Sequence, residues 1–289
     1  MNEIQTSNPN IYFMAPYERL AHLIGATYKT KRQFLSKQGW PHHLYKYKSF
    51  KKIEELRSFI VDSLLYLSAH SDLNDPFEVK SELRFAGDGP YPASYHKYLF
   101  KENRLTLKER KKIQKQLPSP KAIRDGIRKH LKVAVDRTGF HSFTSKPRDL
   151  LMWSHYADAH RGLCLIFSTA HDIDTFIRAL PVSYSETFPV FEYSESPEGD
   201  LIKKAFLTKA LPWKYEHERR IFCPKLAKKF LYFNPASLVG LILGANISTE
   251  NEVVIRGLVD ERVTKGLPPL KIYRAFQSEN EYRLRIQIC

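Results

Sequence analysis

Asn74-Asp75-Pro76-Phe77-Glu78 follows closely on an apolar run, Leu64-Leu65-Tyr66-Leu67-Ser68. An apolar run of this length, followed by Ser, Asp, Asn and Pro, is typical of a strand that ends in a sharp turn. Loops anchored on buried strands are where binding and catalytic residues tend to lie, so Asn74, Asp75 and Glu78 are candidate site residues. The alternative is a structural role: Asn74 and Asp75 can stabilise the turn by hydrogen-bonding to the local backbone, and a purely structural role is also open for Glu78.

The segments around this stretch alternate between helical and β-prone patterns. Apolar residues recur at three- and four-residue spacing over Ile53 to Ile60, which predicts a helix, whereas the mostly apolar Gly162 to Phe167 predicts a strand inside a sheet. Further strands are expected over residues 45–47, 77–83, 140–144, 182–184, 213–223, 238–244, 272–276 and 282–288, and helices over 150–159, 173–180, 201–209 and 248–265, the last with Thr249 as its cap. The pattern predicts an α+β fold with small mixed or antiparallel sheets in a split arrangement, with inserted and peripheral helices.

The 289 residues are enough for one sizeable core. Residues 1–40 are polar and weakly periodic, apart from an expected helix over Tyr17 to Tyr28, and we interpret them as an N-terminal extension. Residues 41–289 are expected to form a single α+β domain. Within it, residues 94–138 are highly charged and interrupted at Pro118 and Pro120, which predicts a basic helical insertion.

The net charge of +15 is large for this length, and much of it lies between Lys101 and Lys132. A basic surface attracts phosphate polyanions, so we expect a nucleic acid or another polyanion to bind these basic helices. The alternative is a solvated helical face that confers solubility.

Several classes of protein do not fit the sequence. No apolar run approaches the ~20 residues that span a membrane, and the N-terminus lacks the pattern of a signal peptide, so we expect no membrane partner. Cys164, Cys223 and Cys289 are far apart, which argues against a disulfide framework and a cysteine-based zinc site and favours the cytoplasm. The motifs Gly-x-Gly-x-x-Gly, Gly-x-x-x-x-Gly-Lys-Ser/Thr, His-Glu-x-x-His and Gly-x-Ser-x-Gly are absent.

Glu216, Glu218 and Arg220 share one face if residues 213–223 form a strand. Such groups cannot lie in a core unless they are paired. They form either a solvent-facing row of ion pairs or a site in which one Glu meets a polar ligand in a cleft.

Two further groups are candidates. Tyr45-Lys46-Tyr47 suits an anionic or planar ligand, although a lysine there also suits an edge strand. His155 and His160 are five residues apart, which does not align them on one helix face. These histidines, with Tyr156 beside them, either pack and hydrogen-bond against the sheet, contact a substrate or hold a metal.

Four segments together resemble a large bacterial family known as a domain of unknown function. They are Leu44-Tyr45-Lys46-Tyr47, Asn74-Asp75-Pro76-Phe77-Glu78, Leu151-Met152-Trp153-Ser154-His155-Tyr156-Ala157 with His160-Arg161-Gly162-Leu163-Cys164, and Trp213-Lys214-Tyr215-Glu216-His217-Glu218-Arg219-Arg220. Their order and spacing cover roughly residues 44–250. The resemblance implies a fold family more directly than a reaction.

The order of these segments is also similar to that of ADP-ribosyltransferases. That family uses a split sheet without a Gly-rich loop. Its first strand carries a His or Arg that meets NAD, a position that falls here on Lys46. Its second strand carries a Ser or Tyr, here Ser68, and a late strand carries a catalytic Glu, here Glu218 or Glu216 in a Glu-x-Glu pattern.

The resemblance implies NAD as the cofactor, with a nucleic acid or protein as the target. The residues that we expect to contact the cofactor are Tyr45, Lys46, Ser68, Asn74, Asp75, Glu78, His155 and Tyr156.

Two alternatives stay open at this stage. One is a metal-dependent nuclease or phosphodiesterase in which Asp75, Glu78 and Glu216 or Glu218 hold Mg²⁺. The other is a non-catalytic nucleic-acid-binding module, favoured by the basic charge and the many Tyr and Phe residues. A Mg²⁺ requirement separates the nuclease from the transferase, and binding without turnover separates the module from both.

Overall fold

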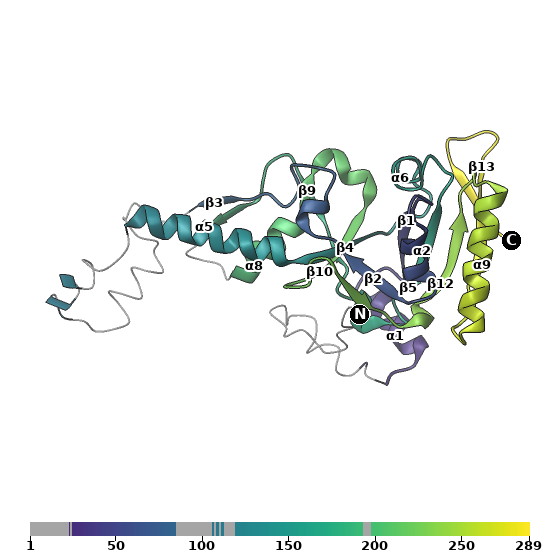
Figure 1. Cartoon of the computed structure of the whole chain (residues 1–289), viewed down its shortest axis with the longest axis horizontal. Coiled ribbons are helices and arrows are strands. Elements are labelled where there is room, and N and C mark those ends of the chain that lie inside the picture. The colour runs from purple at the N-terminus through teal and green to yellow at the C-terminus, as the bar shows by residue number, and fades with distance from the viewer. Residues whose placement is uncertain are drawn as a thin grey trace.

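A mixed sheet of eight strands forms the centre of the computed structural model, in the order β14-β13-β12-β5-β1-β4-β10-β6 (Figure 1). All neighbouring strands are antiparallel except β12 and β13. With helices packed on this sheet, the predicted α+β fold class is confirmed. The strands are β1 (His43–Lys48), β4 (Gly139–Thr144), β5 (Leu163–Ser168), β6 (Leu180–Pro181), β10 (Glu218–Cys223), β12 (Leu238–Leu243), β13 (Lys271–Gln277) and β14 (Leu284–Ile288).

The structure describes residues 23, 25–84, 106, 108–109, 111–112, 119–192 and 198–289. Within these ranges, three two-stranded sheets accompany the large one. They pair β2 (Leu64–Leu67) with β11 (Lys229–Tyr232), β3 (Glu82–Arg84) with β8 (Val190–Glu192), and β7 (Ser183–Ser185) with β9 (Thr208–Ala210). Among the same residues, no helix combines the length and apolar character that crossing a membrane requires.

The large sheet is split between β1 and β4. β1 pairs with β5 along all six of its residues but with β4 only at Tyr45 opposite Thr144. At the other end of β4, Ser68 and Phe140 exchange two backbone hydrogen bonds. β1 and β2 therefore reach β4 at opposite ends, and a gap opens between them.

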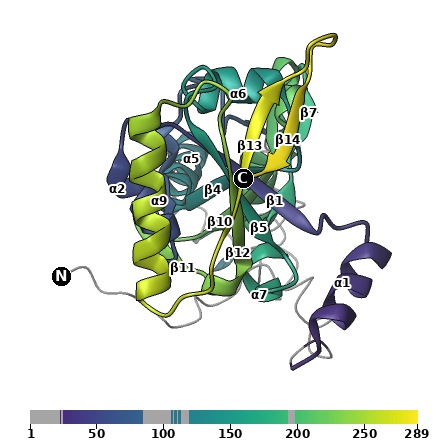
Figure 2. The same cartoon turned by 90° about the vertical axis from the view of Figure 1, so that its right-hand side faces the viewer.

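Helices α2 (Ile53–Ile60) and α9 (Thr249–Thr264) cover one face of the sheet, side by side in Figure 2. Their apolar residues pack with those of β1, β5 and β12 in the largest core cluster. The α9 helix starts with Ser248 as its cap, because the Ser248 hydroxyl accepts the Asn251 N–H. The predicted cap, Thr249, is instead the first residue of the helix.

On the opposite face of the sheet, the helices of the described residues pack toward the two ends. Helix α6 (Leu150–Tyr156) packs Met152 and Trp153 against Tyr47 and Ile242. At the other end, Tyr28 of α1 (Tyr28–Lys37) stacks on His171, which precedes α7 (Ile173–Phe176). The middle of this face carries a groove.

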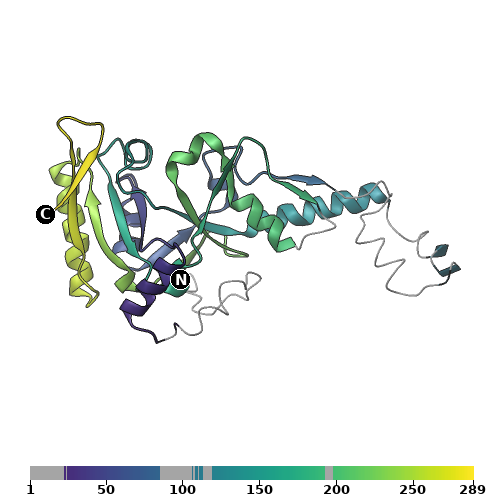
Figure 3. The ribbon, with the colours of Figure 1, turned by 180° about the vertical axis from the view of Figure 1, so that it is seen from behind.

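A second core lies beyond β4 and β10. Helices α5 (Pro120–Arg137) and α8 (Glu198–Phe206) pack Leu131 and Ile202 with Phe140 and Phe222. Figure 3 shows both helices at the end of the molecule away from β13 and β14. Helix α5 begins at Pro120, where proline favours a helix start, in agreement with the helix boundary predicted at this proline.

Several predicted elements differ from the structure in their bounds. The strand over residues 77–83 is reduced to β3, because the Asp75 carboxylate accepts the Phe77 N–H at 2.8 Å and Val79 has a positive φ of 57°. The helix over 201–209 gives way to β9, which pairs with β7. Of the expected helix over residues 17–28, residues 17–22 and 24 lie outside the described residues, and the helix that the structure describes, α1, starts only at Tyr28. Of the basic helical insertion, α5 is described, whereas most of residues 94–118 lie outside the described residues.

Candidate functional site in the split of the sheet

A pocket of about 290 Å³ lies in the split between β1 and β4. All four segments that carry the bacterial-family resemblance contribute to its lining, so these segments meet at one pocket. The residues around it are Tyr45, Lys46, Tyr47, Ser68, Asp72, Leu73, Asn74, Glu78, Phe140, Ser142, Phe143, Thr144, Met152, Tyr156, Lys209, Glu216, Glu218 and Arg220.

Glu216 and Glu218 reach the pocket from two different elements. The expected single strand over residues 213–223 is wrong: η4 (Leu211–Glu216) is a 3₁₀ helix, and β10 begins only at Glu218. Between them, His217 is left-handed, with φ of 44° and ψ of 47°. The turn at His217 brings both carboxylates within 3.4 Å of one ammonium group, that of Lys209.

A buried ion network forms one wall of the pocket. The Lys209 ammonium lies 2.9 Å from Glu78, 2.6 Å from Glu216 and 3.4 Å from Glu218. The Arg220 guanidinium donates to Glu78 at 2.6 Å and to Glu218 at 2.7 and 2.8 Å. All five side chains are buried, so each charge depends on its partners.

The surroundings of Glu216 and Glu218 shift the pKa values of these two neighbouring carboxyl groups in opposite directions. Burial opposes the ionisation of Glu218, but Arg220 and Lys209 outweigh it and lower the pKa of Glu218 to about 2. Burial raises the pKa of Glu216, and Lys209 offsets this only in part while Glu218 adds to it. The Tyr156 hydroxyl also donates to Glu216 at 2.5 Å. Two carboxyl groups whose pKa values are pushed apart are suited to different roles in one reaction.

Lys46 enters the split from the opposite side. Its ammonium donates to the Ser142 carbonyl at 2.7 Å, where β4 has no backbone partner from β1. Burial is the main cause that lowers the pKa of Lys46 to about 7; Lys48 acts in the same direction, and Glu55, Glu218 and Glu216 oppose it. A pKa near the working pH is favourable for a group that transfers protons.

We expect Lys46 to titrate near pH 7, because desolvation disfavours its charged form. The measurement is NMR of the protein after its lysines have been reductively methylated with isotope-labelled formaldehyde, followed as a function of pH. Solvated lysines titrate near ~10.4, and a Lys46→Met variant identifies the resonance that belongs to Lys46. A lysine spectrum in which every resonance titrates near ~10.4 would contradict this description of the pocket.

The predicted site residues divide into two groups. Tyr45, Lys46, Ser68, Asn74, Glu78, Tyr156, Glu216 and Glu218 line the pocket, whereas Asp75 and His155 do not. The Asp75 carboxylate accepts hydrogen bonds from the Trp213 indole N–H, at 2.8 Å, and from the Phe77 backbone N–H in the turn. His155 is exposed on α6, and its Nδ1 lies 3.1 Å from the Tyr215 hydroxyl.

The donor set does not fit the Mg²⁺ site of the nuclease alternative. Asp75 lies outside the pocket, and Glu78, Glu216 and Glu218 are already bound by Lys209 and Arg220. Throughout the described part of the chain, no three His, Cys, Asp or Glu side chains are arranged to hold a metal ion.

Sequence reasoning missed Lys209. It falls at the end of a segment with helical periodicity, whereas the structure places it in the three-residue strand β9. No local pattern distinguishes it from the many other lysines of this basic chain, and only the path of β9 past η4 brings it between the carboxylates.

Comparisons with known proteins give no relative: no family model, no curated protein and no solved structure matches this chain.

Proposed function

We propose that the chain is an NAD-dependent ADP-ribosyltransferase that modifies a nucleic acid or protein target. The observation that carries the proposal is the pair Glu216 and Glu218 across the split from Lys46, around a pocket of about 290 Å³. That volume is at the lower end of the ~300–1,000 Å³ range of small-ligand pockets and suits the nicotinamide riboside end of NAD. The resemblance of the four segments to the bacterial family is part of this proposal, as is a cytoplasmic location.

In the proposed reaction, the bond between the nicotinamide nitrogen and ribose C1′ breaks, and its electron pair leaves with neutral nicotinamide. An oxygen or nitrogen atom of the acceptor forms the new bond at C1′ and gives up its proton. Positive charge develops at C1′ as the bond breaks, so an ionised carboxylate held beside the ribose stabilises the transition state. Glu218, with its pKa at about 2, is ionised at neutral pH and fits this role.

The other residues of the pocket supply position and proton transfer. Arg220 holds Glu218 through two hydrogen bonds, which fixes the direction of its carboxylate. In this proposal, Glu216 with Tyr156 orients the ribose hydroxyls. Lys46, with a pKa of about 7, takes the proton of the acceptor.

The test is the release of nicotinamide from NAD by the wild-type protein, measured by chromatography. NAD labelled in its adenosine half is offered with a panel of RNA, DNA and protein acceptors. We expect nicotinamide to appear in step with label bound to one acceptor class. Absence of NAD binding at ~1 mM, the upper end of common KM values, would reject the proposal. If Mg²⁺-dependent cleavage of nucleic acid accompanies that result, the nuclease alternative is favoured.

A further inference from the structure

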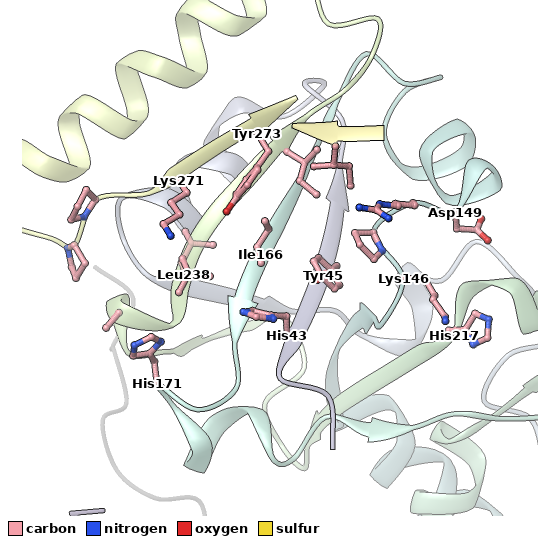
Figure 4. A pocket seen from close by; sticks show the side chains of 18 of the residues that line it. His43, Tyr45, Lys146, Asp149, Ile166, His171, His217, Leu238, Lys271 and Tyr273 are labelled. Atoms are coloured by element: carbon pink, nitrogen blue, oxygen red, sulfur yellow. The ribbon is translucent and has the colours of Figure 1, made fainter. Parts of the chain in front are cut away.

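A groove of about 1,230 Å³ runs across the open face of the sheet, over β1, β5, β12 and β13. Figure 4 shows its labelled lining residues, from His171 at one end to His217 at the other. The volume exceeds the ~300–1,000 Å³ of typical small-molecule pockets, which favours a polymeric ligand. Tyr45 lines both this groove and the pocket in the split, so the two are adjacent.

Aromatic rings follow the length of the groove. Tyr28 and His171 stack at one end, with ring centroids 4.4 Å apart. His43 and Tyr45 come next along β1, with centroids 6.5 Å apart, and Tyr273 lies across the groove on β13. Nucleic-acid bases stack on such rings in proteins that bind single strands.

The floor of the groove is shaped by the strand register. From Tyr45 the row of opposed residues runs through Ile166 and Gly240 to Lys271. Gly240 adds no side chain to this row. A shallow apolar floor with rings on either side leaves room for a base to lie flat.

The charged side chains that line the groove are mostly positive. Lys146, Arg148 and Lys271 line it and are exposed, and among the described residues none of these three has a carboxylate within salt-bridge distance. The acidic residue of the lining, Asp149, is engaged as the cap of α6, where it accepts the Met152 N–H at 3.0 Å. The groove therefore offers unneutralised positive charge to an anionic ligand.

The loop that carries two of these cations is held in place before any ligand binds. The Tyr47 hydroxyl donates to the Lys146 carbonyl at 2.8 Å. The Trp153 indole donates to the Pro147 carbonyl at 3.0 Å. Binding on this loop needs little ordering of its backbone, which favours affinity.

We propose that this groove binds a single-stranded nucleic acid, with bases on the aromatic rings and phosphates on Lys146, Arg148 and Lys271. A second copy of the chain is disfavoured as the occupant, because it would bring the same net charge of +15. A duplex keeps its bases stacked inside and cannot use the rings.

The groove leads toward the candidate carboxylates. His217 lines the groove, while its neighbours Glu216 and Glu218 line the pocket in the split. The bound strand is then the acceptor of the ADP-ribosyl group, a statement that rests on the proposed function. Binding of the strand does not depend on that reaction.

The test is fluorescence anisotropy with labelled oligonucleotides of about 12 nucleotides, within the ~4–16 nucleotide range of single-strand sites. We expect the wild type to bind the single strand more tightly than the duplex. The triple variant Lys146→Ala, Arg148→Ala, Lys271→Ala should make the fall of log affinity with log salt shallower. The magnitude of the slope should decrease by about 2, at ~0.7 per phosphate contact. Tyr273→Ala should weaken binding roughly 5- to 150-fold, and Tyr273→Phe should restore it.

Two control variants with the same loss of charge locate the site. The variant Lys51→Ala, Lys52→Ala, Lys229→Ala removes exposed lysines beside α2 and on β11. Its affinity should fall only by the amount that losing three positive charges from the net charge causes, to within about twofold. Lys121→Ala, Lys129→Ala, Lys132→Ala tests the basic helix α5. The proposal is overturned if the salt dependence of the affinity weakens in the α5 variant but is unchanged in the groove variant. It is also overturned if the duplex binds as tightly as the single strand.

Oligonucleotide binding and nicotinamide release, measured on the same variants, distinguish the groove proposal from the transferase proposal. Oligonucleotide binding without nicotinamide release rejects the transferase and leaves the groove assignment standing. Nicotinamide release with unchanged binding in the groove variants rejects the groove and leaves the transferase standing.

Discussion

Replacing Glu218 with Gln is expected to lower the rate of nicotinamide release from NAD by roughly 10²- to 10³-fold. The substitution keeps the shape of the side chain but removes the negative charge that faces the developing positive charge at ribose C1′. Arg220 and Lys209 hold this carboxylate ionised, with a pKa of about 2, so its charge is present throughout the neutral range. The measurement is chromatographic release of nicotinamide at saturating NAD, with the affinity for NAD measured separately.

Glu216→Gln is the companion variant. Glu216 has a raised pKa and accepts the Tyr156 hydroxyl, so its replacement should affect orientation of the ribose more than transition-state charge, with a smaller loss of rate. Glu261→Gln serves as the control, because Glu261 is a partly exposed residue of α9 paired with Arg57 and Lys265. Full activity in both Glu218→Gln and Glu216→Gln would remove these residues from the reaction.

Replacing Arg220 with Met is expected to cost about 3–5 kcal/mol of unfolding free energy. Arg220 is buried and binds the carboxylates of Glu78 and Glu218, whose other cationic partner among the described residues is the ammonium of Lys209. Leaving buried charge without its partner carries a large desolvation penalty. For a chain of this size the loss corresponds to a fall in Tm of roughly 10 °C, measured by circular dichroism.

The matched control is Arg256→Met, which breaks an exposed pair with Glu252 and should cost at most about 1 kcal/mol. The pH dependence gives a second readout. A carboxyl whose pKa is lowered from 4.5 to about 2 stabilises the fold fully above 4.5 and loses that contribution as the pH falls toward 2. The stability difference between wild type and Arg220→Met should therefore shrink over that range. Equal stability of the two proteins at pH 7 would show that the network does not hold the fold.

The elements near the site were largely predictable because their signals are local. The three- and four-residue spacing of Ile53 to Ile60 and the apolar run of Gly162 to Phe167 each match an element of the structure, α2 and β5. Glu78, Glu216 and Glu218 stood out as polar residues beside apolar segments, and all three line the pocket. Local patterns also misled: the alternation over residues 213–223 suggests one strand, but the left-handed residue His217 divides it.

The sequence by itself determined the α+β class, the basic charge and the carboxylates that the pocket uses. These follow from periodicity and composition, which are properties of neighbouring residues. The tertiary structure alone decided that Lys209 joins the carboxylates, that Lys46 fills the split, and that Asp75 and His155 stay outside. It also decided that helices α2 and α9 pack on one face of the sheet and that the groove lies on the other. Such contacts depend on strand order and on the path of the chain between distant segments, and no short stretch of sequence encodes either.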